Sequence, residues 1–193
     1  MENNIIYLAA GQSRRFGANK LLWKIDGKPM FAHTLDLLLE IVAEKENFTL
    51  TVVTMYDEIA EYVEKSHVPR VRCVISPESV GGVSFSIKNG IKDLPDKECY
   101  YTFVVADEPR LTYGTLMGFM EGCIASGCMT GEVVCKGVGG NPAMFHASLK
   151  DKLMALAGDR GGRAVLKEYK DSCFRYEVTF RDEIEDIDLP LHM

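Results

Sequence analysis

The stretch "IIYLAAGQSRRFGANK", residues 5–20, decides how the fold of this chain is interpreted. It begins with an apolar run that is typical of a buried strand, and it continues as a basic loop that contains Gly11 and Gly17. A glycine-containing loop that follows a strand can turn its backbone N–H groups toward an anion. The stretch therefore predicts a phosphate-binding loop at the end of the first strand.

Two common phosphate-binding patterns do not fit this loop. A dinucleotide-binding loop has the spacing GxGxxG, whereas Gly11 and Gly17 are separated by five residues. A P-loop has its lysine directly after the second glycine, followed by Ser or Thr, whereas Lys20 comes three residues after Gly17 and precedes Leu21. The remaining interpretation is a longer loop in which Arg15 and Lys20 reach the anion.

Strand-like and helix-like patterns alternate along the rest of the chain. Strands are predicted at residues 4–10, 48–54, 71–75, 100–106, 131–137, 142–146 and 173–179. Helices are predicted at residues 30–45, 57–67, 84–94, 112–127, 148–158 and 164–169. This alternation predicts a single α/β domain over residues 1–193, with a mostly parallel sheet and helices on both faces. Such sheets bind ligands at the carboxyl ends of their strands, here the basic loop and the segment around Asp107.

The composition argues against several classes of protein. Hydrophobic residues make up 47% and charged residues 26% of the chain, and no apolar run approaches the roughly 18 residues that cross a membrane. A net charge of −6 argues against a nucleic-acid partner. The first residues lack the basic region of a secretion signal, and the six cysteines show no CxxC spacing. We therefore expect a cytoplasmic protein with reduced cysteines and no membrane contact.

The basic residues nevertheless gather beside the loop. Between Gly11 and Lys28 there are five bases and one acid, Asp26. An acidic protein that concentrates its bases in one place is suited to a small polyanionic ligand, because Lys and Arg pair with phosphate over short distances.

The pattern LAAGxSxRFGxxK, residues 8–20, resembles the nucleotide-binding signature of the MobA-like NTP transferases. The resemblance continues in order through "LLWKIDGKPM", "GGVSFSIKNGI", "VVADEPRLT", "GNPAMF", "LAGDRGGRAVL" and "DIDLP". Within this family the chain is most similar to the molybdenum cofactor cytidylyltransferase branch, since the guanylyltransferase branch usually has LAGG in place of LAAG. The resemblance implies a three-layer α/β/α fold, the Rossmann-like fold of nucleotide-diphospho-sugar transferases (GT-A type).

The same resemblance implies an activity. The enzyme would move CMP from CTP to the phosphate of molybdenum-bound molybdopterin and release pyrophosphate, with Mg²⁺ as cofactor and a molybdenum hydroxylase apoenzyme as a further partner. Two alternatives stay open. One is a transferase of the same fold that uses GTP or acts on a sugar, polyol or choline phosphate. The other is a non-catalytic chaperone or insertion factor for the molybdenum cofactor.

Individual residues take expected roles. By resemblance, the catalytic residues would be Arg15, Lys20 and Asp107, and the metal ligands would be Asp107 and Asp188. The nucleotide-binding residues would be Leu8, Ala9, Ala10, Gly11, Arg15, Lys20, Gly82, Ser86 and Asn89. The candidates for the acceptor site are Asn141, His146, Arg160 and Arg163. The chain departs from the family pattern at Glu108, Asn141 and Leu189, where the family usually has Gln, His and Thr.

Overall fold

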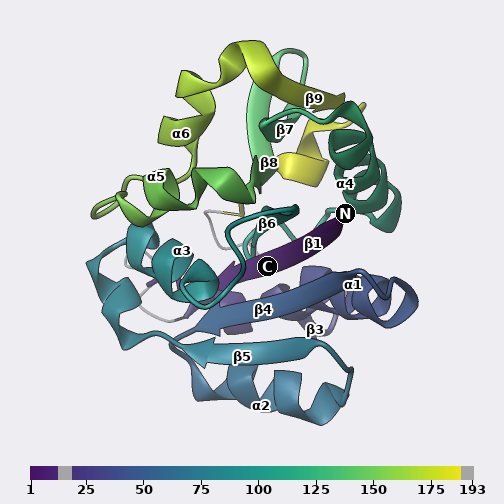
Figure 1. Cartoon of the computed structure of the whole chain (residues 1–193). Coiled ribbons are helices and arrows are strands. Elements are labelled where there is room, and N and C mark those ends of the chain that lie inside the picture. Colours follow the sequence, from purple (N-terminus) through teal and green to yellow (C-terminus); the bar gives the residue numbers. More distant parts are fainter. Residues whose placement is uncertain (13–18, 188–193) are drawn as a thin grey trace.

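The computed structural model describes residues 1–12 and 19–187, and it has three layers around a seven-stranded sheet (Figure 1). The strand order is β5 (Val71–Ile75), β4 (Phe48–Thr54), β1 (Glu2–Ala9), β6 (Cys99–Val105), β8 (Val138–His146), β7 (Thr130–Cys135) and β9 (Cys173–Glu177). A second, two-stranded sheet pairs β2 (Lys24–Ile25) with β3 (Lys28–Pro29). This architecture confirms the predicted α/β fold class.

The direction of the strands places the candidate site. Strands β5, β4, β1 and β6 run parallel, and β7 runs parallel to β9, whereas β8 is antiparallel to both of its neighbours. Strands β1 and β6 are adjacent, with Leu8 opposite Val105. The loop that follows β1 and the segment that follows β6 therefore leave the sheet side by side, at its carboxyl edge.

Helices cover both faces of the sheet. One face carries α1 (Met30–Glu44), α2 (Asp57–Ser66) and α4 (Tyr113–Ser126), and the other carries α3 (Val83–Ile91), α5 (Lys150–Met154) and α6 (Arg163–Glu168). Within β1, the fully buried Ile5 and Tyr7 belong to the first core and Ile6 belongs to the second, because successive side chains of a strand point to opposite faces. None of the described helices is long and apolar enough to cross a membrane.

Short 3-10 helices complete the connections. They are η1 (Lys20–Leu22), η2 (Pro77–Gly81), η3 (Ala147–Leu149), η4 (Lys170–Ser172) and η5 (Arg181–Ile184). The helix predicted at 148–158 is shorter than expected, since α5 ends at Met154. The segments η1 and η2 both border the carboxyl edge of the sheet, where they supply walls of the candidate site.

The hairpin between β7 and β8 differs from the sequence prediction. The strand predicted at 131–137 ends at Cys135, because Lys136 and Gly137 have positive φ angles of 51° and 77° and form a two-residue turn. The next strand begins at Val138, four residues earlier than the predicted start at Pro142. This longer β8 brings Asn141 to the carboxyl end of β6.

Candidate active site

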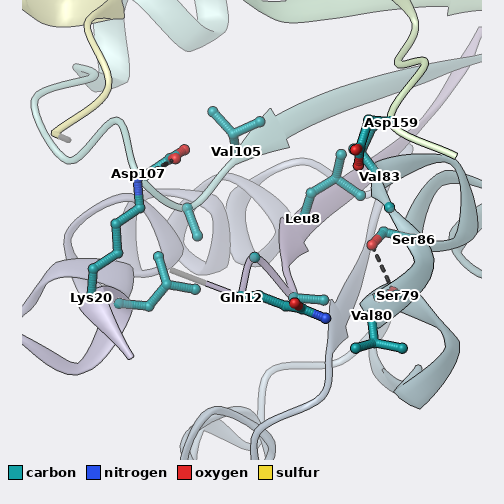
Figure 2. Close-up of a pocket in the computed structure, with 15 residues that line it drawn as sticks. Leu8, Gln12, Lys20, Ser79, Val80, Val83, Ser86, Val105, Asp107 and Asp159 are labelled. Carbon is teal, nitrogen blue, oxygen red and sulfur yellow. Dashed lines mark hydrogen bonds and ion pairs between the residues drawn. The ribbon is translucent and has the colours of Figure 1, made fainter. Parts of the chain in front are cut away.

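A cavity of about 380 Å³ lies at the carboxyl ends of β1 and β6 (Figure 2). Its lining comes from five segments of the chain. They are the end of β1 with the following loop (Leu8, Ala10, Gly11, Gln12), η1 (Lys20, Leu21), η2 and the start of α3 (Ser79, Val80, Gly82, Val83, Ser86), the end of β6 (Val105, Ala106, Asp107), and Asp159. Most of the predicted nucleotide-binding residues therefore share one cavity. Arg15 and Asp188 lie outside the described residues.

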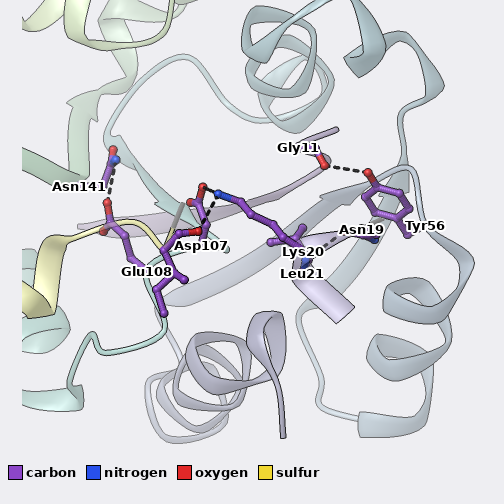
Figure 3. Close-up of polar contacts among 9 residues, drawn as sticks. Gly11, Asn19, Lys20, Leu21, Tyr56, Asp107, Glu108 and Asn141 are labelled. Carbon is purple, nitrogen blue, oxygen red and sulfur yellow. Dashed lines mark hydrogen bonds and ion pairs between the residues drawn. The ribbon is translucent and has the colours of Figure 1, made fainter. Parts of the chain in front are cut away.

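The start of the loop that follows β1 is held by two residues near the end of β4. Thr54 is the last residue of that strand, and Tyr56 lies just beyond it. The Tyr56 hydroxyl donates a hydrogen bond of 2.7 Å to the carbonyl of Gly11 (Figure 3). The Thr54 hydroxyl donates one of 3.0 Å to the carbonyl of Ala9. Ala9 is fully buried in the core, whereas Ala10 and Gly11 line the cavity. No pattern in the sequence pointed to Tyr56 or Thr54, because they contact the loop only through the fold.

Lys20 and Asp107 form the charged end of the cavity. Their Nζ and Oδ2 atoms are 2.9 Å apart, and Lys20 also donates a hydrogen bond of 3.2 Å to the carbonyl of Ile187 (Figure 3). Lys20 is held at the start of η1 by Asn19, whose side chain accepts a hydrogen bond from the backbone of Leu21. Only 8% of Lys20 is exposed, so its ammonium group is partly shielded from water. Its contacts with Asp107 and Ile187 fix the position of this group.

The other end of the cavity carries a chain of hydroxyl groups. Ser86 donates a hydrogen bond of 2.7 Å to Ser79, and the hydroxyls of Ser79 and Ser76 are also 2.7 Å apart. Asn89 donates a hydrogen bond to the Ser76 hydroxyl but does not line the cavity, so it contacts the cavity only through this series of hydroxyl groups. Gly82 has a φ angle of +121°, and a Cβ atom at this position would lie 2.7 Å from the Asp159 carboxylate. The fold therefore requires glycine at position 82.

A second cavity of about 530 Å³ adjoins the first, and the two share Leu8, Val83, Val105 and Asp107. Two of the predicted acceptor residues line it. Asn141 donates a hydrogen bond of 3.2 Å to Glu108, and Arg163 donates one to the carbonyl of Gly139. Arg160 is exposed and lines neither cavity.

His146 is not part of this site. It lies opposite Tyr100, near the amino end of β6, and packs edge-on against the Tyr100 ring at 5.3 Å between centroids. Its Nδ1 atom is 2.8 Å from the Ser148 hydroxyl. Because Asp107 follows the carboxyl end of the same strand, the prediction that His146 lines the acceptor site is wrong, and the residue has a packing and capping role.

Glu108 is an unusual buried carboxylate beside the charged end. It is 3% exposed, its Oε1 atom accepts the hydrogen bond from Asn141, and its Oε2 atom has no hydrogen-bond partner among the described residues. Burial raises the pKa of Glu108 to about 8; the negative charges of Asp107 and Asp186 also raise it, and the Asn141 hydrogen bond partly opposes the change. Two of the departures from the family pattern, Glu108 and Asn141, are therefore in direct contact.

The residues at the charged end fit a divalent cation that is shared with a substrate. The Asp107 carboxylate is 29% exposed and lines both cavities. The described residues contain no group of three or more Asp, Glu, His or Cys side chains that could hold a metal by themselves. A single carboxylate that acts together with substrate phosphates suits Mg²⁺, which is usually bound by one or two carboxylates and phosphate oxygens.

The comparisons with known proteins agree with this fold. Residues 5–173 match the MobA-like NTP transferase domain, and the chain therefore belongs to this family. A probable molybdenum cofactor guanylyltransferase of Pyrococcus horikoshii is 32% identical over 120 residues, which are 56% of this chain and 62% of that protein. A protein of the same name from Thermococcus sibiricus is 33% identical over 84 residues, which are 44% of this chain and 41% of that protein. The chain thus matches less than two thirds of each relative.

Solved structures support the fold over nearly the whole chain. Rv0371c from Mycobacterium tuberculosis has a TM-score of 0.75 at 18% identity, and the match covers 97% of this chain and 93% of that one. Molybdopterin-guanine dinucleotide biosynthesis protein A from Archaeoglobus fulgidus has a TM-score of 0.66 at 16% identity, with the same coverage of both chains.

The position of Lys20 leads to a first prediction. Lys20→Ala is expected to weaken the binding of a magnesium nucleoside triphosphate roughly 10- to 100-fold, because a hydrogen bond to a charged group contributes about 1.5–3 kcal/mol. Titration calorimetry of the purified variant measures this. Lys28→Ala is the matched control, since Lys28 pairs with Asp36 at 2.5 Å and lines neither cavity. Equal affinities in wild type and Lys20→Ala would remove Lys20 from the phosphate site.

Proposed function

We propose that this protein is a nucleotidyltransferase of molybdenum cofactor biosynthesis, which transfers a nucleoside monophosphate to the terminal phosphate of molybdopterin and releases pyrophosphate. The observation that carries the proposal is the meeting of Lys20, Asp107 and the loop after β1 in one cavity. This combination offers a cation, a carboxylate and backbone N–H groups to a triphosphate. The family membership and the names of the curated relatives support the same class of reaction.

In the proposed reaction, an oxygen of the molybdopterin phosphate attacks the α-phosphorus of the nucleotide. A new P–O bond forms, and the bond between the α-phosphorus and the bridging oxygen breaks, so that pyrophosphate leaves with the electron pair. The acceptor phosphate is already an anion at neutral pH, and the step needs no general base. Lys20 would orient the triphosphate and offset the charge that builds up on pyrophosphate. Asp107 would bind the divalent cation, which supplies further charge neutralisation when bound.

We favour GTP as the donor, because the two curated relatives described above are named as probable molybdenum cofactor guanylyltransferases. The sequence-based expectation was CTP, and Ala10 is the observation that keeps CTP as a second candidate. Ala10 lines the cavity, and the guanylyltransferase branch usually has glycine at this position.

The test is thermal unfolding with GTP, CTP, ATP or UTP, each with Mg²⁺, with Mn²⁺ or without a metal. Manganese is included because Rv0371c was crystallised with it. A nucleotide at about 100 times its dissociation constant adds roughly 2.7 kcal/mol to the free energy of unfolding. We expect the largest metal-dependent effect with GTP, followed by pyrophosphate release when molybdopterin is added. A CTP-selective effect would support the cytidylyltransferase, and no effect with any nucleotide would favour the non-catalytic alternative.

A further inference from the structure

We propose that Asp159 determines the base specificity of the nucleotide cavity by accepting hydrogen bonds from the N–H groups of guanine. This inference rests on the proposed function, since it requires that the cavity binds a nucleoside triphosphate. Two of the predicted acceptor residues, Arg160 and Arg163, belong to the "GDRGGR" turn at residues 158–163. Its first charged residue, however, lines the first cavity and not the second.

The two ends of the first cavity differ in chemistry (Figure 2). One end has the ion pair of Lys20 and Asp107, and Lys20 supplies the basic side chain among the described lining residues. The other end has the apolar Val80 and Val83 and the hydroxyls of Ser79 and Ser86, and Asp159 lies there. A triphosphate would bind at the basic end, and the uncharged groups at the other end are suited to a flat heterocyclic base.

Asp159 is placed at this end by its backbone. The carbonyl of Gly158 accepts a hydrogen bond of 3.1 Å from the backbone of Ser84 in the first turn of α3. The Asp159 carboxylate lies against Gly82, where it would be 2.7 Å from a Cβ atom. The side chain is exposed to solvent, and its carboxylate makes no hydrogen bond or ion pair with the other described residues. Asp159 thus adds a carboxylate to the lining of a cavity whose proposed ligand carries negatively charged phosphates.

A carboxylate in such a cavity needs hydrogen-bond donors from the ligand, because an ionised carboxylate has only acceptors. Guanine presents two adjacent donors on one edge, the N1–H group and the exocyclic 2-amino group, and these match the two carboxylate oxygens. The corresponding edges of adenine and cytosine place a ring nitrogen acceptor beside the amino group, and uracil flanks its N–H group with two carbonyls. Asp159 would therefore attract guanine and oppose the other three bases.

The experiment compares wild type and Asp159→Asn in equilibrium binding of GTP, ITP, XTP and dGTP, all with Mg²⁺. An amide offers one acceptor and one donor, which match the N1–H group and the 2-oxo group of xanthine. We expect the variant to lose GTP affinity roughly 10- to 100-fold and to gain affinity for XTP, as for a lost bidentate base contact. Wild type should bind ITP, which lacks the 2-amino group, more weakly than GTP, and this preference should vanish in the variant.

The matched control is Asp151→Asn, which makes the same charge change at an exposed position of α5 outside both cavities. Its nucleotide affinities should equal those of wild type. Unchanged GTP binding by Asp159→Asn would overturn the inference and leave the proposed function standing. A loss seen with GTP but not with dGTP would assign Asp159 to the ribose and also overturn it. Wild type that binds no nucleotide, or that prefers CTP, would overturn the guanine assignment together with the corresponding part of the proposed function.

Discussion

Asp107→Asn is expected to reduce metal-dependent turnover by about 100-fold or more, the size of effect seen when a group that stabilises transition-state charge is removed. The amide keeps the size of the side chain but cannot supply the negative charge that binds a divalent cation. Pyrophosphate release with saturating nucleotide and acceptor measures the effect. Turnover at the wild-type rate would exclude Asp107 as the metal ligand.

The same substitution removes the ion pair between Lys20 and Asp107, so stability must be measured in parallel. Lys20 is mostly buried, and we expect a loss of about 1–3 kcal/mol in the free energy of unfolding. The control is Glu121→Gln, which removes the exposed Lys45–Glu121 pair of 2.9 Å. Exposed pairs contribute about 1 kcal/mol at most, so this control should unfold nearly as wild type does. A folded but inactive Asp107→Asn variant would separate the catalytic effect from the structural one.

The second large effect is expected at Glu108, in the dependence of stability on pH. The pKa of this carboxyl is raised to about 8, whereas its ordinary value is 4.5. Between these two values the folded protein keeps a proton that the unfolded chain releases, so the free energy of unfolding falls as pH rises. The slope is about 1.4 kcal/mol per pH unit, and the total loss is at most about 5 kcal/mol by the time the pH has passed 8.

Glu108→Gln should abolish this part of the pH dependence, because a buried amide of the same shape does not ionise. Urea unfolding between pH 4 and pH 9 measures the difference between the variant and wild type. The variant should become relatively more stable as the pH rises, and most of its advantage should appear by pH 8. Glu46→Gln, at an exposed position, controls for the loss of a glutamate elsewhere. A constant difference across the whole pH range would contradict the raised pKa.

Much of the fold could be predicted from the sequence, because strand-like and helix-like patterns of apolar residues alternate along the chain. This alternation indicates a sheet with helices on both faces. Ile5, Ile6 and Tyr7 predicted a strand buried on both faces, and each is fully buried in one of the two cores. The extent of β8 could not be predicted. Gly139 and Gly140 are typical of a loop, yet they pair with Val134 and Val133 and extend the strand. Pairing with a partner strand overrode the local preference in this segment.

The candidate site was predictable where its residues lie next to one another in the sequence or at the ends of strands. Lys20 and Asp107 fall into this class, and the structure brings them together in one ion pair. The contact between Glu108 and Asn141 joins residues 33 positions apart and depends on the register of β8 with β6. For His146 the relation between sequence and space is reversed. It is close to Asn141 in the sequence, but five residues of extended strand carry it roughly 17 Å away from the carboxyl edge.

The ion pair between Lys20 and Asp107 also bears on how ligands cooperate in this site. These two groups neutralise one another, so a cation that bound Asp107 alone would remove the Asp107 carboxylate from the ammonium of Lys20. A triphosphate that took Lys20 alone would leave Asp107 beside phosphate oxygens of the same charge. When both ligands bind, the cation pairs with Asp107 and the triphosphate pairs with Lys20, so new charge pairs replace the ion pair that is lost. Nucleotide and cation should therefore bind with positive thermodynamic coupling, each raising the affinity of the protein for the other by the same factor.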